Sequence, residues 1–283
     1  MRIFRIFCSF SLQVSGFCII FAVSNQKLNL DYGEETLTRE IVEANGWDKL
    51  EVITADMLEG YTDVSGSAFL RCPIKEITLP DTIKVIHDHA FYKTHLKKIV
   101  LPETITRICW GAFASCEELE EVIFKGNTIY MLEGECFAHC HKLKKINLPT
   151  NCNYIFANVF DGCSTITSKF EIQDYTKPVV AYKGFNNDMT CMNGFQYEEG
   201  GAYEFEGEPK LCKRGFHACL NPLDTFSYYG PYNFYKYHEV ILEGVSKERL
   251  ENSKVVAKKI TIGREISKEE MIEIFNKKVN SEK

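Results

Sequence analysis

Three cysteines and one histidine in the last third of the chain have the chemistry of metal ligands. Cys191, Cys212, His217 and Cys219 offer three thiols and one imidazole, a ligand set that structural zinc uses. His217 and Cys219 are two residues apart, so a strand would direct both side chains to one side. The spacing lacks a tight C-x-x-C pair, and buried thiols beside a hydrogen-bonded histidine are the alternative. In an exported protein, a disulfide from Cys219 to Cys212 or to Cys191 would compete with the metal.

A second group of residues near the same segment has the chemistry of a nucleotide site. Residues 215–229 have the order of a strand and then a helix that ends in two tyrosines, and this order resembles the ADP-ribosyltransferase-like folds. The resemblance implies that residues 182–184 form the first nucleotide-contacting strand and that Glu239 is the acid of a late strand. Members normally have Arg or His before the glycine, whereas Lys183 stands there. The alternative is that Tyr228 and Tyr229 pack the helix against a sheet.

No stronger enzymatic motif accompanies these residues. The sequence contains no phosphate-binding GxxxxGK[ST] loop, no HExxH helix and no GxSxG turn, so we expect no catalytic residues. The 283 residues carry a net charge of −6, which argues against a nucleic-acid partner. With 45% apolar and 25% charged residues, the composition is typical of a globular protein of one or two domains.

A repeat of 22–24 residues occupies the middle of the chain and would form its scaffold. Each copy has an L-x-x-I-x-L segment, then two aliphatic residues three apart, and then a small residue followed by Phe. The repeated phenylalanines are Phe69, Phe91, Phe113, Phe137 and Phe160. Three residues later the copies carry Cys72, Thr94, Cys116, Cys140 and Cys163. This period and the leucine spacing indicate a leucine-rich repeat.

The residue types explain how such copies would stack. Ile99 and Leu101 are two apart, so a strand points both to one face, and Pro102 ends the strand. We expect the aliphatic pair and the Phe to come from the turn and the convex side and to fill the same core. Stacked copies would then bury the phenylalanines in one shared interior, with the cysteines packed beside them as small thiols.

Residues 64–168, with this order of strand, Leu-Pro, Ile-x-x-Ile, Ala-Phe and Cys, resemble the BspA-like leucine-rich repeats of the treponemal type. Proteins with these repeats occur on bacterial surfaces, in protists and in viruses, and those with a role mostly bind proteins or surfaces. The resemblance implies a scaffold without a specific site. Strand residues that face solvent are the candidate protein-binding residues: Lys75, Thr78, Lys97, Val100, Glu120, Ile123, Lys144 and Asn147. Simple solvation is the alternative for all of them.

The N-terminal region contains two further predicted segments. Residues 1–24 have two arginines, an apolar stretch and small residues before Asn25, the pattern of a secretory signal peptide. With a signal peptide the protein would be secreted or on the cell surface, and without one it would be cytoplasmic. Residues 34–63, including a helix over 34–45, are expected to cap the open end of the solenoid. No stable membrane span is expected.

The repeat ends near residue 168, and residues 177–283 are expected to form a small α+β domain. Strand candidates are residues 179–182, 194–197, 202–205, 215–219, 239–242 and 254–262, and Ser267 begins a closing helix with a capping box. Motifs across 178–265, among them residues 194–197, 215–219 and 221–224, resemble an uncharacterised domain common in bacteriophage and bacterial proteins. By analogy, this pairing suggests a phage, giant-virus or prophage-derived source.

These observations predict an α/β, β-rich leucine-rich-repeat solenoid of about five repeats, followed by a small C-terminal α+β domain. The expected function is non-catalytic binding of another protein through the strand face. The alternative is a C-terminal domain that acts as an ADP-ribosyltransferase-like enzyme or as a zinc-stabilised effector. We therefore expect no cofactor, or one structural zinc.

Overall fold

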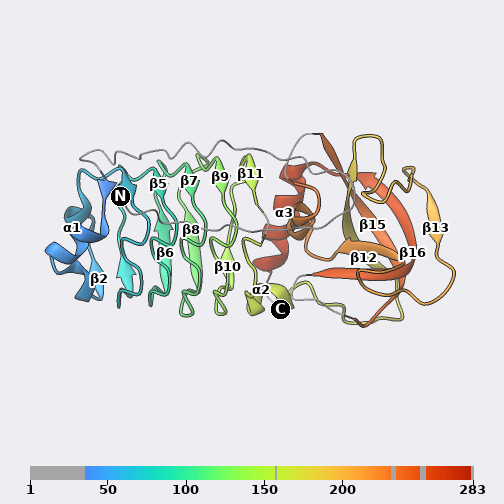
Figure 1. Cartoon of the computed structure of the whole chain (residues 1–283), viewed down its shortest axis with the longest axis horizontal. Helices are drawn as coiled ribbons and strands as arrows, with labels where there is room; N and C mark the ends of the chain where they lie inside the picture. The colour runs from blue at the N-terminus through green and yellow to red at the C-terminus, as the bar shows by residue number, and fades with distance from the viewer. Residues whose placement is uncertain (1–35, 157, 231–233, 249–252, 282–283) are drawn as a thin grey trace, which may run out of the picture. The chain divides into compact units, whose positions relative to one another are not determined.

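The computed structural model describes residues 36–156, 158–230, 234–248 and 253–281 (Figure 1). All of these residues belong to one compact unit, Glu34–Lys283. The predicted signal peptide, residues 1–24, lies outside the described residues. None of the described helices has the length and apolar character that a membrane span requires.

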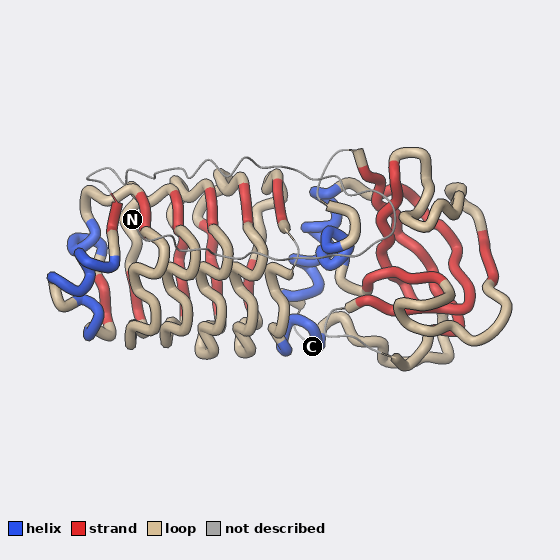
Figure 2. Tube along the Cα trace, viewed as in Figure 1, coloured by secondary structure: helices blue, strands red, loops and turns tan. Residues whose placement is uncertain are grey.

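The repeats form parallel sheets along two sides of the stacked coils (Figure 2). The longer sheet has the order β1 (Thr36–Leu37), β3 (Asp63–Val64), β5 (Val85–Ile86), β7 (Arg107–Ile108), β9 (Met131–Leu132) and β11 (Tyr154–Ile155). The second side has β6 (Lys98–Leu101), β8 (Glu121–Phe124) and β10 (Lys145–Ile146), and a separate pair, β2 (Val52–Ile53) and β4 (Glu76–Ile77).

The L-x-x-I-x-L segments are strands as predicted, since β4, β6, β8 and β10 lie in them and bury their central aliphatic residue. The Ile-x-x-Ile segments differ from the prediction of a turn: their second aliphatic residues, such as Ile86 and Ile108, lie on the longer sheet. These residues form strands because the same short extended segment recurs in each coil and pairs with its equivalent in the next coil. The N–H of Cys109, for example, donates to the carbonyl of Ile86 over 2.8 Å.

The repeated phenylalanines lie in one interior, which confirms the central expectation for the repeats. Phe91, Phe113 and Phe137 are fully buried. Their ring centroids are 5.1 Å and 5.4 Å apart, with nearly parallel planes. Phe69 and Phe160 continue the stack at 5.3 Å and 5.9 Å. Each ring therefore gains stacking contacts in addition to the burial of its apolar surface.

The cysteine positions form a second column of buried, free thiols beside the rings. The thiol of Cys140 donates to the carbonyl of Phe113 in the previous coil over 3.2 Å, and Cys116 and Cys163 make the equivalent bond over 3.1 and 3.0 Å. Burial raises the pKa of the Cys116 thiol to about 11, so the thiol stays protonated and remains a donor. These contacts agree with the interpretation that the column packs the core.

Two backbone positions in every coil lie in the left-handed region. In the second copy they are His89, with φ of 56°, and Lys93, with φ of 57°, on either side of Phe91. The other copies use Ser67 and Arg71, Gly111 and Ser115, Glu135 and His139, and Asn158 and Gly162. These paired turns direct the chain around each Phe, although most of the residues are not glycine and adopt this conformation at a cost.

The predicted N-terminal cap is itself a first coil. Its strands β1 and β2 pair with β3 and β4 of the next coil. Helix α1 (Arg39–Ala44) begins after Thr38, whose hydroxyl accepts from the N–H of Ile41. The Arg39 guanidinium donates to the carbonyl of Leu70 and to the thiol of Cys72, and therefore covers the first end of the cysteine column.

After the last coil and helix α2 (Ser164–Ser168), the chain forms an antiparallel sheet. Its strands are β12 (Val179–Asn186), β13 (Ala202–Glu204), β14 (Phe216–Cys219), β15 (Tyr235–Val245) and β16 (Lys254–Glu265). Strands β16, β14, β12 and β15 pair in that order, and β15 also pairs with β16, so these four strands close on themselves. The predicted strand 194–197 is reduced to an isolated antiparallel bridge between Gln196 and Thr190, and it follows a turn in which the N–H of Gly194 donates to the carbonyl of Cys191.

The closing helix α3 (Lys268–Val279) starts at Ser267 as predicted, with the Ser267 hydroxyl accepting from the N–H of Glu270. Its apolar stripe contacts the last coil of the repeats: the Phe275 ring stacks on Phe160 with centroids 5.1 Å apart. The side-chain amide of Asn276 accepts from the N–H of Leu148 over 2.8 Å and donates to its carbonyl over 2.7 Å. Helix α3 thus covers the C-terminal end of the solenoid in the way that a further coil would.

Candidate functional site

A cavity of about 390 Å³ lies in the C-terminal sheet and collects most of the residues singled out for chemistry. Strand β12 contributes Tyr182, Lys183 and Gly184, and strand β14 contributes His217 and Cys219. The remaining walls come from the turn around residue 192, the loop 212–215, the 3₁₀ helix η3 (Pro222–Ser227) and the start of β16. A volume of this size is typical of a small-molecule site.

The four predicted zinc ligands reach this cavity but do not form one ligand set. Cys191, Cys212, His217 and Cys219 all line it. Within the described part of the chain, however, no three of them bring their ligand atoms within 4.8 Å of one another. The Nε2 atom of His217 is also engaged, since it accepts from the N–H of Cys212 over 2.9 Å. The three cysteines are free thiols, so the geometry differs from both the single Cys₃His centre and the competing disulfide.

The position of His217 keeps its imidazole neutral. Burial, and then the nearby ammonium groups of Lys254 and Lys183, lower the pKa of His217 to about 4. A neutral ring with a lone pair on Nε2 can accept the N–H of Cys212, whereas a protonated ring cannot. The imidazole therefore orders the loop that carries Cys212.

His217→Gln is expected to remove part of the acid sensitivity of folding. The ordinary histidine pKa is 6.5 and that of folded His217 is about 4, so between these values the unfolded chain binds the extra proton. The stability that the wild type gains from neutral His217 should therefore be fully present above pH 6.5 and should be lost as the pH falls toward 4. For a partly exposed ring we expect a loss of about 1–2 kcal/mol. Urea unfolding at pH 7 and 4.5 measures it, with the exposed His141→Gln as control, and equal pH dependence in all three proteins would contradict the expectation.

A cluster of tyrosines around Cys191 forms another wall of the cavity. The Tyr229 hydroxyl accepts from the N–H of Met192 over 3.2 Å. Burial, and then the neighbouring Cys191 thiol, raise the pKa values of Tyr197 and Tyr229. The hydroxyls of Tyr197 and Tyr229 therefore stay neutral at ordinary pH. Residue 184 must be a glycine, because a Cβ atom there would lie 2.5 Å from the Tyr229 ring.

The residues expected from the nucleotide-site interpretation are only partly brought together. Tyr182, Lys183, Tyr228 and Tyr229 line the cavity. Glu239 lies on β15 opposite Tyr182 in the strand register, but it is not one of the cavity-lining residues. The cavity therefore has basic and aromatic groups without the predicted carboxylate.

The eight predicted protein-binding residues lie on or directly beside β4, β6, β8 and β10, and all are exposed or half-buried. Several join neighbouring coils through ion pairs: Lys75 lies 2.7 Å from Glu51, and Lys144 lies 2.6 Å from Glu120. Sequence reasoning missed Glu121, which pairs with Lys98 over 2.7 Å and with Lys145 over 2.8 Å. The signal was present, because the second x position of L-x-x-I alternates in charge from copy to copy, as Glu76, Lys98, Glu121 and Lys145.

A comparison with known families identifies the repeats. Residues 54–188 match the BspA type leucine rich repeat region in six copies. This part of the chain consists of leucine-rich repeats. A later part, residues 179–274, matches a domain of unknown function, DUF7666. The cavity lies within this second match, and no match is found among the curated proteins.

Three solved structures of other leucine-rich repeat proteins are similar to part of the chain. A leucine rich cell surface protein from Faecalibacterium prausnitzii is 20% identical, covers 41% of this chain and 46% of its own length, and has a TM-score of 0.29. A protein from Bacteroides ovatus is 27% identical, with coverages of 41% and 36% and a TM-score of 0.32. One from T. pallidum is 26% identical, with coverages of 40% and 59% and a TM-score of 0.33. The chain thus spans less than two thirds of each of these proteins.

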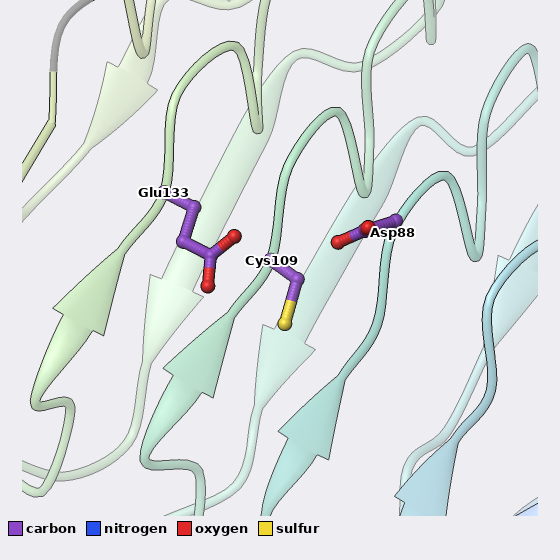
Figure 3. A group of neighbouring side chains, drawn as sticks. All are labelled: Asp88, Cys109 and Glu133. Atoms are coloured by element: carbon purple, nitrogen blue, oxygen red, sulfur yellow. The ribbon is translucent and has the colours of Figure 1, made fainter. Parts of the chain in front are cut away.

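One further group with metal-ligand chemistry lies on the repeats (Figure 3). Asp88, Cys109 and Glu133 come from three successive coils and are the one group of three His, Cys, Asp or Glu side chains within 4.8 Å among the described residues. Glu133 accepts from the Nε of Arg107 over 2.6 Å. Burial, and then the Glu133 carboxylate, raise the pKa of the Cys109 thiol to about 12. A protonated thiol beside an already paired carboxylate is a poor metal ligand set.

Proposed function

We propose that this leucine-rich repeat protein is a non-catalytic scaffold that binds another protein through the outer face of the L-x-x-I-x-L strands. The observation that carries the proposal is the ordered row of side chains on β4, β6, β8 and β10. Successive parallel strands present equivalent residues at a constant spacing, and ion pairs such as Lys144–Glu120 hold the long side chains in place. A surface that is ordered before binding loses less conformational entropy when a partner docks.

The centre of this face supplies the apolar contacts that a protein partner requires. Val100 on β6 and Ile123 on β8 are half-buried neighbours in the strand register. The charged pair Lys98 and Glu121 lies two residues earlier on the same strands, and the exposed polar residues Thr78 and Asn147 hold the equivalent positions in the adjacent copies. An apolar centre with a polar rim is the usual composition of a protein–protein interface.

Photo-crosslinking tests the proposal. A crosslinking amino acid at Ile123 or Thr78 of the full chain, in an extract of the source cells, should capture one protein, whereas the same probe at the exposed Thr106 beside β7 should not. The captured protein should then bind the purified chain, and Ile123→Asp should weaken binding at least about tenfold without unfolding the repeats. If the probe at Thr106 captured the protein as well as the probes at Ile123 and Thr78 do, the strand face would be excluded as the binding surface. The same conclusion would follow if the Ile123→Asp variant bound the captured protein as tightly as the wild type does.

A further inference from the structure

The cavity of the C-terminal sheet has an unusual charge composition for an acidic protein. The chain carries a net charge of −6, yet the charged side chains that line the cavity are Lys183, Lys213 and Lys254, with no Asp or Glu among the described lining residues. Burial is the main cause of the low pKa of His217, and Lys254 and then Lys183 add to it by disfavouring protonation. The cavity is therefore a site of positive potential.

Lys183 is the decisive residue because it is a largely buried lysine whose ammonium group has no counter-ion among the described residues. The side chain is 9% exposed, and its Nζ atom makes one hydrogen bond, to the carbonyl of His217 over 3.0 Å. Among the described residues no carboxylate lies within ion-pair distance of it. Its other neighbours are the rings of Phe185 and Tyr197, each 5.5 Å from Nζ. A buried cation with unused donors is costly to a fold unless an anion binds beside it.

A second buried polar group points to the same ligand. The Thr225 side chain is 2% exposed and lines the cavity, and its hydroxyl makes no hydrogen bond of normal geometry among the described residues. Burial raises the pKa of the Cys219 thiol, and the Thr225 hydroxyl lowers it as a hydrogen-bond partner, so this thiol is the group that a ligand oxygen would replace. Buried hydroxyls are normally satisfied, and an oxygen acceptor is a stronger partner than a thiol.

The remaining walls fit a flat ring. Tyr228 and Tyr229, the two residues after η3, line the cavity. The Nζ atom of Lys254 lies 4.2 Å from the centroid of the Tyr228 ring. Aromatic faces with an adjacent lysine stack well on planar heterocycles. The volume of about 390 Å³ is sufficient for one such ring with a small charged substituent.

We propose that this cavity binds a nucleotide-sized ligand that places a phosphate group beside Lys183 and a planar ring against the tyrosines. Lys183 neutralises the phosphate, and the Thr225 hydroxyl donates a hydrogen bond to it. The site is independent of the strand face of the repeats, so it concerns a small ligand in addition to a protein partner. Neither covalent chemistry nor a further cofactor is required.

Calorimetric titration of the full chain with AMP, adenosine and inorganic phosphate tests the proposal. AMP carries both groups, adenosine only the ring and phosphate only the charge. AMP should bind more tightly than either, and phosphate should compete with it. Failure of AMP to bind, or adenosine binding as tightly as AMP, would overturn the phosphate site. Phosphate binding as tightly as AMP would overturn the ring subsite.

Lys183→Met, with Lys259→Met as the matched control on the exposed part of β16, separates binding from folding. Lys183→Met should weaken AMP binding at least about tenfold, whereas Lys259→Met should leave it unchanged. Removal of an unpaired buried cation should also raise the Tm of the ligand-free protein, by about 2–4 °C. A lower Tm together with unchanged AMP binding would identify Lys183 as a structural residue and overturn the assignment.

Discussion

Phe275→Ala is expected to lower the free energy of unfolding by about 3–5 kcal/mol and to loosen the end of the repeats, although residue 275 lies outside them. The Phe275 ring is fully buried and lies against both Phe160 and Phe170, with centroids 5.1 Å and 6.0 Å away. Its removal leaves a cavity where helix α3 meets the last coil. Urea unfolding gives the free energy, and amide hydrogen exchange shows which coils lose protection.

Glu273→Ala is the matched control for Phe275→Ala, because Glu273 is exposed on the same helix. It should change the free energy of unfolding by less than about 0.5 kcal/mol. The loss of protection in Phe275→Ala should be greatest at Tyr154–Ile155 and at helix α2. Equal stability of the two variants would contradict the role of α3 as the cover of the solenoid.

Phe113→Ala is also expected to lower the free energy of unfolding by about 3–5 kcal/mol, but its effect should spread in both directions along the repeats. Phe113 is the middle ring of the column and stacks on Phe91 and on Phe137, so its loss breaks two ring contacts at once. Each coil contacts only its neighbours, and a weak central coil therefore uncouples the two halves. A broader thermal transition in circular dichroism, together with the urea midpoint, measures this effect.

Phe113→Leu separates the contribution of ring stacking from that of volume. Leucine fills most of the space, so this variant should retain most of the stability that alanine loses. If Phe113→Ala left the transition as sharp as in the wild type, with no loss of stability, the shared interior would not hold the coils together.

The repeat could be predicted from the sequence because its information is local. The L-x-x-I-x-L segments, the ring column and the capping box at Ser267 each follow from residue types at fixed spacing. The sheet through Ile86 and Ile108 was missed because a two-residue strand has no alternation that distinguishes it from a turn. The left-handed turns at His89 and Lys93 were missed because neither residue type signals a positive φ.

In the candidate site, too, the sequence predicted some features and could not predict others. Sequence reasoning selected residues that lie near one another, since Cys191, Lys183 and His217 line one cavity. It could not give the distances between the thiols, which depend on how the loops at residues 191 and 212 fold. The unpaired state of Lys183 also depends on tertiary structure, because it requires that no carboxylate from another strand reaches Nζ. The apolar stripe of α3 was predicted, whereas the surface that it covers was not.

The contact of Asn276 with Leu148 spans 128 residues of the chain and has a consequence for biosynthesis. During translation the coils can form in order as they leave the ribosome, but the last one keeps an uncovered end until α3 has been made. The whole antiparallel sheet is synthesised in that interval. A chaperone that shields an open strand edge would therefore act on nascent chains in which α3 has not yet emerged, and release them once α3 covers the last coil.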